Sequence, residues 1–334
     1  MRIGWVSSDT LTARVASFAS LSPAVAMRIA NVARWIEKHV PGVETEMYRR
    51  DRRYDIVVFA KAMDEECRRE AEKIQGYGGR VVFDANVNYY EIWGDYDIPD
   101  TKPTEQQRRD AVAMTQVADW VVADSSYLLG VVQRYTKSAG WIPDNVDLGL
   151  FGARRQDRGA DRIRLVWSGM AKKARPLLSI REALATLPDA ELVVVSEAAP
   201  AELAELEQSI PCRYVPFTPR RYAKTLRTCD VIISPKRLTN AYELAHTEWK
   251  ITLGMAAGLP AVASPQQSYV EAIGHRGGGI VADGTDEWAE ALGSLASDAD
   301  LRARLGSLAR ETVVERYATP VVAAEYAEVL GRLN

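Results

Sequence analysis

The sequence predicts two α/β domains, each a doubly wound parallel sheet, that face each other across a cleft. Three observations support this fold class. The chain has 334 residues, enough for two cores of ordinary size. Short apolar strands alternate with helical segments along nearly the whole chain, which is the pattern of parallel βαβ units. A hydrophilic stretch, Phe151–Asp161, interrupts the alternation once and is typical of a linker.

In the first half, apolar runs of strand length are separated by segments with helical spacing. We expect strands at Ile3–Ser7, Asp55–Ala60, Arg80–Asp84, Trp120–Ala123 and Gly140–Ile142, and helices near Ser22–His39, Asp64–Gln75, Glu105–Gln116 and Ser125–Tyr135. The turn at Ile142–Asp147 then begins the crossover out of the first domain.

The same alternation restarts after the linker. Strands are expected at Ile163–Ser168, Glu191–Ser196, Arg213–Phe217, Asp230–Ser234, Ala261–Ala263 and Gly279–Val281, and the tail from Asp298 to Asn334 is helical. Before the fifth of these strands we predict a helix capped by Thr247 and ended by Gly258 in a left-handed conformation. This helix begins with a lysine, Lys250, beside a strand edge, an arrangement that favours anion binding.

Composition excludes several classes of function. The net charge of -3 argues against nucleic acid as a partner, and the three scattered cysteines and three histidines show no metal-ligand spacing. No apolar run has membrane-spanning length, and the start, Met1–Val6, resembles a strand rather than a signal peptide, so we expect a cytoplasmic protein. Hydrolase, P-loop and dinucleotide-binding glycine motifs are absent from the letters.

Two segments of the second half carry a family resemblance. Lys250–Ser264 (KITLGMAAGLPAVAS) and the strand-loop segment Val166–Arg175 (VWSGMAKKAR) resemble the C-terminal half of retaining glycosyltransferases of family 4, the glycosyl transferases group 1. The resemblance implies the GT-B architecture of two Rossmann-like domains. It implies an acceptor-binding domain over residues 1–152, a nucleotide-sugar-binding domain over 153–315, and a C-terminal helix over 316–334 that returns to the first domain.

The resemblance also implies site residues. Arg175 and Lys250 would act as catalytic cations on the diphosphate leaving group, where charge grows as the sugar bond breaks. Donor-binding residues would be Gly169, Glu243, His246, Thr247 and Glu248. Three positions depart from the family pattern: Met170 replaces an arginine, and Ala245 and Leu253 replace the two family glutamates.

On the acceptor side, the segment Gly79–Asn88 resembles a strand-plus-acid motif of polysaccharide-type members. Asp84 and Asn86 follow its strand and would face the acceptor, although capping the turn after the strand is an equally simple role for Asp84. Asp95-Tyr96-Asp97 has a metal-like spacing, but no histidine accompanies it, and we predict no metal site.

The function implied is transfer of a sugar from a nucleotide diphosphate sugar to an acceptor hydroxyl, with retention and without a cofactor. The acceptor would be a saccharide, a lipid or a small molecule, and the basic run Arg49–Arg53 leaves open a peripheral contact with the inner membrane face. The alternatives are a degenerate member that binds nucleotide or saccharide without transfer, a two-lobed small-molecule binding protein, and a sugar-nucleotide epimerase of the same fold.

Overall fold

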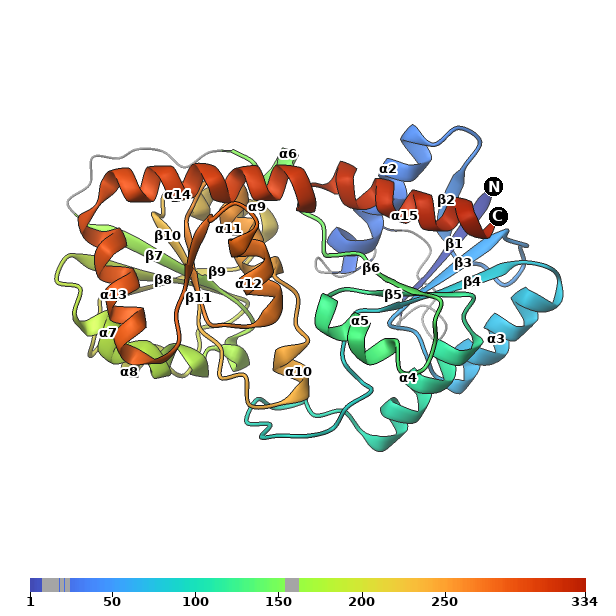
Figure 1. Cartoon of the computed structure of the whole chain (residues 1–334), viewed down its shortest axis with the longest axis horizontal. Coiled ribbons are helices and arrows are strands. Elements are labelled where there is room, and N and C mark those ends of the chain that lie inside the picture. Colours follow the sequence, from blue (N-terminus) through green and yellow to red (C-terminus); the bar gives the residue numbers. More distant parts are fainter. Residues whose placement is uncertain (8–17, 19–20, 22–24, 154–161) are drawn as a thin grey trace.

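The computed structural model describes residues 1–7, 18, 21, 25–153 and 162–334. Within them, the strands form two all-parallel sheets of six, one in each half of the chain. Figure 1 shows the two sheets side by side along the long axis of the molecule, each flanked by helices. Two doubly wound α/β domains were predicted from the alternating pattern, and the structure confirms them.

The first sheet has the order β2-β1-β3-β4-β5-β6. Its strands are β1 (Arg2–Ser7), β2 (Glu44–Met47), β3 (Ile56–Ala60), β4 (Arg80–Ala85), β5 (Trp120–Ala123) and β6 (Ala139–Trp141). Its helices are α2 (Asn31–His39), which continues the π-helical turn Ala26–Ala30, α3 (Glu65–Gly76), α4 (Glu105–Val117) and α5 (Ser126–Val132). All five residues of β3 are buried, because helices cover both faces of a parallel sheet.

Polar residues just before the helices determine where three of them begin. The side chains of Asp64, Thr104 and Ser125 accept hydrogen bonds from the first turns of α3, α4 and α5. Strand β2 was not predicted, since its letters, Glu-Thr-Glu-Met, contain no apolar run. It is an edge strand in which only Thr45 and Met47 are buried.

The second sheet has the order β12-β11-β10-β7-β8-β9. Its strands are β7 (Ile163–Ser168), β8 (Ala190–Ser196), β9 (Cys212–Pro216), β10 (Val231–Ser234), β11 (Ala261–Ala263) and β12 (Gly279–Val281). The helices are α7 (Arg181–Ala185), α8 (Leu203–Leu206), α9 (Pro219–Leu226), α10 (Ala241–Leu244), α11 (Trp249–Ala256), α12 (Gln267–Gly274), α13 (Gly284–Ser297) and α14 (Ala299–Thr312), with 3-10 turns at Ala171–Lys173 and Arg175–Ile180. This strand order is that of dinucleotide-binding folds.

The chain passes between the domains twice, at adjacent places. On the way out it forms α6 (Leu148–Phe151), and on the way back it passes through the π-helical turn Val313–Tyr317 into α15 (Thr319–Leu333). The backbone of Val146 donates to the carbonyl of Tyr317 at 2.7 Å and accepts from Thr319 at 3.0 Å. Of the predicted linker, residues 154–161 lie outside the described part, and Phe151 is instead a buried helical residue.

The C-terminal helix packs on the first domain, as the fold class predicted. In Figure 1, α15 runs back beside α2. Val322, Tyr326 and Leu330 of α15 are buried in the same apolar core as Ile29 and Ile36. Among the helices of the described residues, none has both the length and the apolar character that crossing a membrane requires.

Helix α11 ends as predicted but begins differently. Gly258 has a φ of 82°, the left-handed conformation expected of a helix stop. The residue directly before the helix is Glu248, whose side chain makes no capping bond, but the hydroxyl oxygen of Thr247 accepts a hydrogen bond at 3.4 Å from the backbone of Trp249, the first helical residue. The hydroxyl of Thr247 donates to Asp144 of the first domain at 2.9 Å.

Candidate functional site

A cavity of about 420 Å³ lies where the carboxyl ends of both sheets meet. In each sheet the chain reverses its direction of winding beside the first strand, between β1 and β3 and between β7 and β10. Such switch points leave a crevice that binds ligands. Residues at the ends of all four strands line the cavity, namely Ser7, Lys61, Ser168, Gly169 and Lys236.

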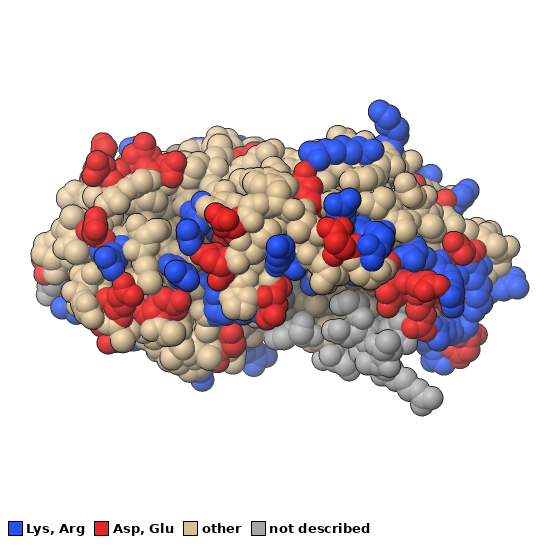
Figure 2. All heavy atoms as spheres, turned by 90° about the horizontal axis from the view of Figure 1, so that it is seen from below, with Lys and Arg blue, Asp and Glu red and all other residues tan. Residues whose placement is uncertain are grey.

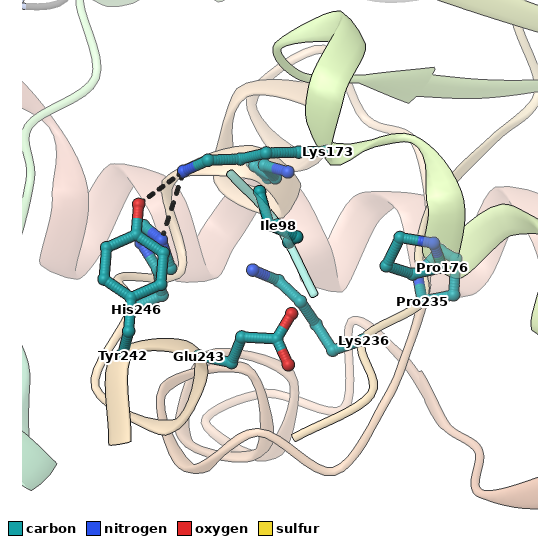
Figure 3. A pocket seen from close by; sticks show the side chains of 9 residues that line it. Ile98, Lys173, Pro176, Pro235, Lys236, Tyr242, Glu243 and His246 are labelled. Carbon is teal, nitrogen blue, oxygen red and sulfur yellow. Dashed lines mark hydrogen bonds between the residues drawn. The ribbon is translucent and has the colours of Figure 1, made fainter. Parts of the chain in front are cut away.

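Three lysines and a histidine of the second domain gather at one end of this cavity. Lys173, Lys236, His246 and Lys250 line both the large cavity and a small enclosed one of about 10 Å³ beside it. Figure 3 shows Lys173 bonded to Tyr242 and His246, with Lys236 and Glu243 turned toward the same space. The Nζ of Lys173 donates to the Tyr242 hydroxyl at 2.6 Å and lies 3.4 Å from Nε2 of His246.

These buried basic side chains lower one another's pKa values. Burial, together with the charges of Lys172 and Lys61, lowers the pKa of Lys173 to about 8. Burial and Lys173 likewise lower the pKa of Lys236 to about 8. The pKa values of Lys250 and His246 fall well below their usual values for the same two reasons, burial first and neighbouring lysines second.

Within the described residues, no ion pair joins Lys173, Lys236 or Lys250 to a carboxylate. One acid, Glu243, favours the charged form of all three lysines through its negative charge. Glu243 is buried in the lining of the small cavity, and its Oε2 has no hydrogen-bond partner. A buried group of cations without matching anions is suited to a ligand that carries several negative charges.

The structure brings together two residues predicted for the donor site. Lys250 lies in the first turn of α11, with its Nζ over the ring of Trp167 at 5.2 Å from the ring centre. Gly169 follows β7, and a Cβ added there would lie 3.0 Å from that Nζ and 2.7 Å from the Trp167 ring. Glycine therefore leaves the space through which a ligand reaches the lysine.

Arg175 is placed differently from our expectation. It is exposed at the start of a 3-10 turn and lines neither cavity. Lys173, two residues earlier, points into the site instead. A 3-10 turn rotates about 120° per residue, so that residues two apart face different directions. Lys173 thus occupies the position in the cavity lining that we expected for Arg175.

The remaining predicted donor residues divide into two groups. His246 and Thr247 line the large cavity. Glu248 is fully buried, lines neither cavity, and has no hydrogen-bond partner for either carboxylate oxygen. Burial raises its pKa well above the usual value, and Asp144 and Asp124 add to the effect. Glu248 is thus not placed to contact a ligand in either cavity.

The two positions that lack the family glutamates also differ from each other. Leu253 lines the large cavity, so its apolar side chain stands where the resemblance implies a ribose contact. Ala245 instead packs into the apolar core of the first domain.

On the first-domain side, Asn86 lines the cavity but Asp84 does not. Asp84 is fully buried and accepts two hydrogen bonds from Arg28, at 2.7 and 2.9 Å, and one from the hydroxyl of Tyr326 at 2.8 Å. Asp84 therefore joins both α15, through Tyr326, and the turn Ala26–Ala30, through Arg28, to the first sheet, and it does not face the cavity. Sequence reasoning missed Arg28, which also donates to Asp144 at 2.6 Å, and Asp124, which follows β5 in the lining.

The Asp95-Tyr96-Asp97 segment belongs to a strap, residues 88–100, that joins the first domain to the second. Gly94 forms an antiparallel bridge with Asn240, and Asp95 donates from its backbone to Thr239 at 3.1 Å. Asp97 pairs with Arg237, and Ile98 reaches the lining of the small cavity. No group of three or more potential metal ligands occurs among the described side chains.

The basic run Arg49–Arg53 is largely neutralised. Arg49, Arg50 and Arg52 form ion pairs with Asp51, Glu66 and Glu46 respectively, and Arg53 lies over the ring of Tyr77. Figure 2 shows acidic and basic side chains interspersed over the face of the molecule that it presents. These pairs give no support to a membrane contact through this segment.

Comparisons with known proteins agree with this geometry. Residues 164–298 match the family model described as Glycosyl transferases group 1. No curated protein sequence matches the chain. Solved structures share its fold, among them HepE of Anabaena in complex with UDP, with a TM-score of 0.70 and 16% identity over 99% of this chain and 100% of that one.

Two further structures extend the likeness. Sucrose-phosphate synthase of Thermosynechococcus elongatus has a TM-score of 0.65 and 14% identity, over 84% of this chain and 74% of that one. WaaG, a glycosyltransferase involved in lipopolysaccharide biosynthesis, has a TM-score of 0.62 and 12% identity, over 99% of each chain. The fold is that of the GT-B proteins, and the family match of the second domain supports a glycosyltransferase.

Proposed function

We propose that the protein is a metal-independent, retaining glycosyltransferase that uses a nucleotide diphosphate sugar. The observation that carries the proposal is the cluster of Lys173, Lys236 and Lys250, which lies at the switch point of the second sheet and forms no ion pair with a carboxylate in the described part of the chain. A diphosphate supplies the missing charge, and burial strengthens its attraction to the lysines.

The reaction follows from this placement. The bond between the anomeric carbon of the donor sugar and the diphosphate oxygen breaks, and negative charge grows on the diphosphate beside Lys250. The acceptor enters from the first-domain side, and its hydroxyl oxygen forms the new bond to the anomeric carbon. Its proton passes to the departing diphosphate. Attack on the face that the diphosphate leaves retains the configuration, and the protonated lysines do the work of a metal ion.

UDP is the first nucleotide to test, since the HepE structure contains it. The experiment incubates the protein with radiolabelled UDP-, GDP- and ADP-sugars and a panel of saccharide, lipid and small-molecule acceptors. We expect transfer from one donor by the wild type and none by Lys250→Ala. Proton NMR of the product should show the donor's anomeric configuration; an inverted product would contradict the retaining mechanism.

A second candidate is a degenerate member that binds nucleotide without transfer. Leu253 favours it, because an apolar side chain in the cavity cannot accept a hydrogen bond from a ribose. Tight binding of UDP together with no turnover of any donor would support this reading. Appearance of a free epimer without an acceptor would instead indicate an epimerase.

A further inference from the structure

One carboxylate in the first-domain half of the large cavity, that of Asp124, forms no ion pair within the part of the chain that the structure describes. Among the described residues of the cavity lining, Arg28 is the only arginine, and it donates to other carboxylates. Its Nε and Nη2 donate to Asp84, and its Nη1 donates to Asp144. Asp144 also accepts the hydroxyl of Thr247. Three carboxylates, Asp84, Asp124 and Asp144, thus lie around one guanidinium, which donates hydrogen bonds to Asp84 and Asp144 but not to Asp124.

Asp124 is the carboxylate left over. It follows β5, is 4% exposed, lines the cavity, and its Oδ1 has no hydrogen-bond partner. The side-chain oxygen of Asn86, after β4, lines the same cavity and is likewise buried without a partner. Because β4 and β5 are adjacent in the sheet, these two hydrogen-bond acceptors share one edge. A buried acceptor without a donor costs free energy, which a ligand carrying the donor restores.

We propose that Asp124 and Asn86 form an acceptor subsite for a protonated amine, so that the acceptor is an amino sugar or a similar amino polyol. This rests on the proposed glycosyl transfer and names the class of its acceptor. A cation is favoured over a neutral hydroxyl because the cluster of Arg28 with the three carboxylates carries one positive and three negative charges when Asp124 is ionised. An ammonium group reduces this excess of negative charge and donates up to three hydrogen bonds.

The ionisation of Asp124 gives the subsite a distinct readout. Burial raises the pKa of Asp124 well above its usual value; Asp144 and Asp84 raise it further, and Arg28 opposes them. Glu248, whose pKa Asp124 raises in turn, also faces this carboxylate. In the free protein Asp124 therefore keeps its proton to a higher pH than an ordinary aspartate does. An ammonium ligand displaces this proton, whereas a neutral sugar leaves it in place.

The test compares D-glucosamine with D-glucose by calorimetry at mildly acidic pH, with and without saturating UDP. A charge-assisted contact predicts at least about ten-fold tighter binding of glucosamine. Titrations in two buffers of different ionisation enthalpy should show release of about one proton per glucosamine and none for glucose. UDP should strengthen glucosamine binding, because the diphosphate neutralises the lysines on the opposite wall.

Asp124→Asn keeps the shape but removes the charge, and should abolish both the preference and the proton release. Glu44→Gln removes an exposed charge from β2 and should change neither. Unchanged UDP affinity shows that each variant is folded. Asn86→Asp, which adds a negative charge to the same edge, should increase the preference.

Equal binding of the two sugars, binding of neither, or a preference that survives Asp124→Asn would overturn the amine subsite. These outcomes leave the proposed transfer intact as long as wild-type protein binds UDP and turns over a donor. Absence of UDP binding would instead overturn the proposed transfer.

Discussion

Gly94 of the first domain and Asn240 of the second pair their backbones in an isolated antiparallel bridge. The pairing is close: a Cβ at Gly94 would overlap the carbonyl oxygen of Thr239 and come within 2.7 Å of the Cα of Asn240. Only glycine fits, and its φ of 88° favours glycine as well. The strap between the domains therefore depends on one residue without a side chain.

Gly94→Ala should separate the strap from the second domain. We expect a larger radius of gyration in small-angle scattering and a lower unfolding temperature. Gly42→Ala is the matched control, because Gly42 also has a positive φ, 74°, but nothing lies within 4 Å of its added Cβ. Both variants bear the backbone strain of about 1 kcal/mol, and only Gly94→Ala should open the domains. Equal scattering by the two would contradict the role of the bridge.

Lys250→Ala should weaken binding of UDP far more than binding of uridine. Loss of one charge-assisted contact, worth about 1.5–3 kcal/mol, corresponds to roughly ten-fold to hundred-fold in affinity. Lys224→Ala, an exposed lysine of α9, is the control and should leave UDP affinity unchanged. Lys236→Ala should act like Lys250→Ala, and the double variant should be non-additive since both hold one diphosphate. Equal losses for UDP and uridine, measured by calorimetry, would exclude this role.

Affinity for UDP should fall as the pH rises through about 8, where Lys173 and Lys236 lose their protons in the free protein. Calorimetry at about pH 7 and at about pH 9.5 compares the protein before and after these lysines lose their protons. Binding should also take up protons at the higher pH, because the diphosphate raises the lysine pKa values. An affinity that stays constant across this interval would show that the lysines do not face the phosphates.

The free energy of unfolding of the free protein should rise with pH, whereas the affinity for UDP falls. The two lysines have pKa values of about 8 in the folded state, against 10.5 for a lysine without a shift. Between these values the unfolded chain binds more protons, so that these two groups make the free energy of unfolding rise with pH. Lys236→Met removes the buried charge, so the free energy of unfolding, measured in urea, should rise less with pH. The same variant should no longer bind UDP tightly.

Tyr326→Phe should destabilise the contact between α15 and the first sheet. Its hydroxyl donates to the charged Asp84 at 2.8 Å, whereas the hydroxyl of the control residue, Tyr90, meets the neutral Thr115 at 2.7 Å. We expect losses of about 1.5–3 kcal/mol for Tyr326→Phe and about 0.5–1.5 kcal/mol for Tyr90→Phe. Urea unfolding followed by tryptophan fluorescence measures both. A larger loss for Tyr90→Phe would show that the charge of Asp84 adds nothing.

Much of the fold was predictable because it depends on local patterns. The strands β3 and β4 are apolar runs that become buried on both faces, and Gly258 is a helix stop readable from its neighbours. The edge strand β2 was not predictable from apolar content, because its stability comes from backbone pairing with β1 and not from a run of buried side chains.

The candidate site was only partly predictable. Lys250 and Gly169 stand in contiguous motifs, and the structure places both in the cavity lining. Arg28 has partners 56 and 116 residues away, and no local pattern links residues so far apart. Asp124 belongs to no recognisable sequence motif either, because the charged groups that surround it come together only when the chain folds. Spacing along the chain placed Arg175 incorrectly, because it does not describe how a 3-10 turn directs side chains.

The position of Ile98 has a kinetic consequence. Ile98 belongs to the strap of the first domain, yet it lines the small cavity together with Lys236 and His246 of the second domain. A diphosphate seated on the lysines is therefore enclosed partly by a residue that moves with the other domain. On the proposed function, we therefore expect release of the spent nucleotide to be coupled to opening of the Gly94–Asn240 bridge, so that separation of the strap contributes to the turnover rate.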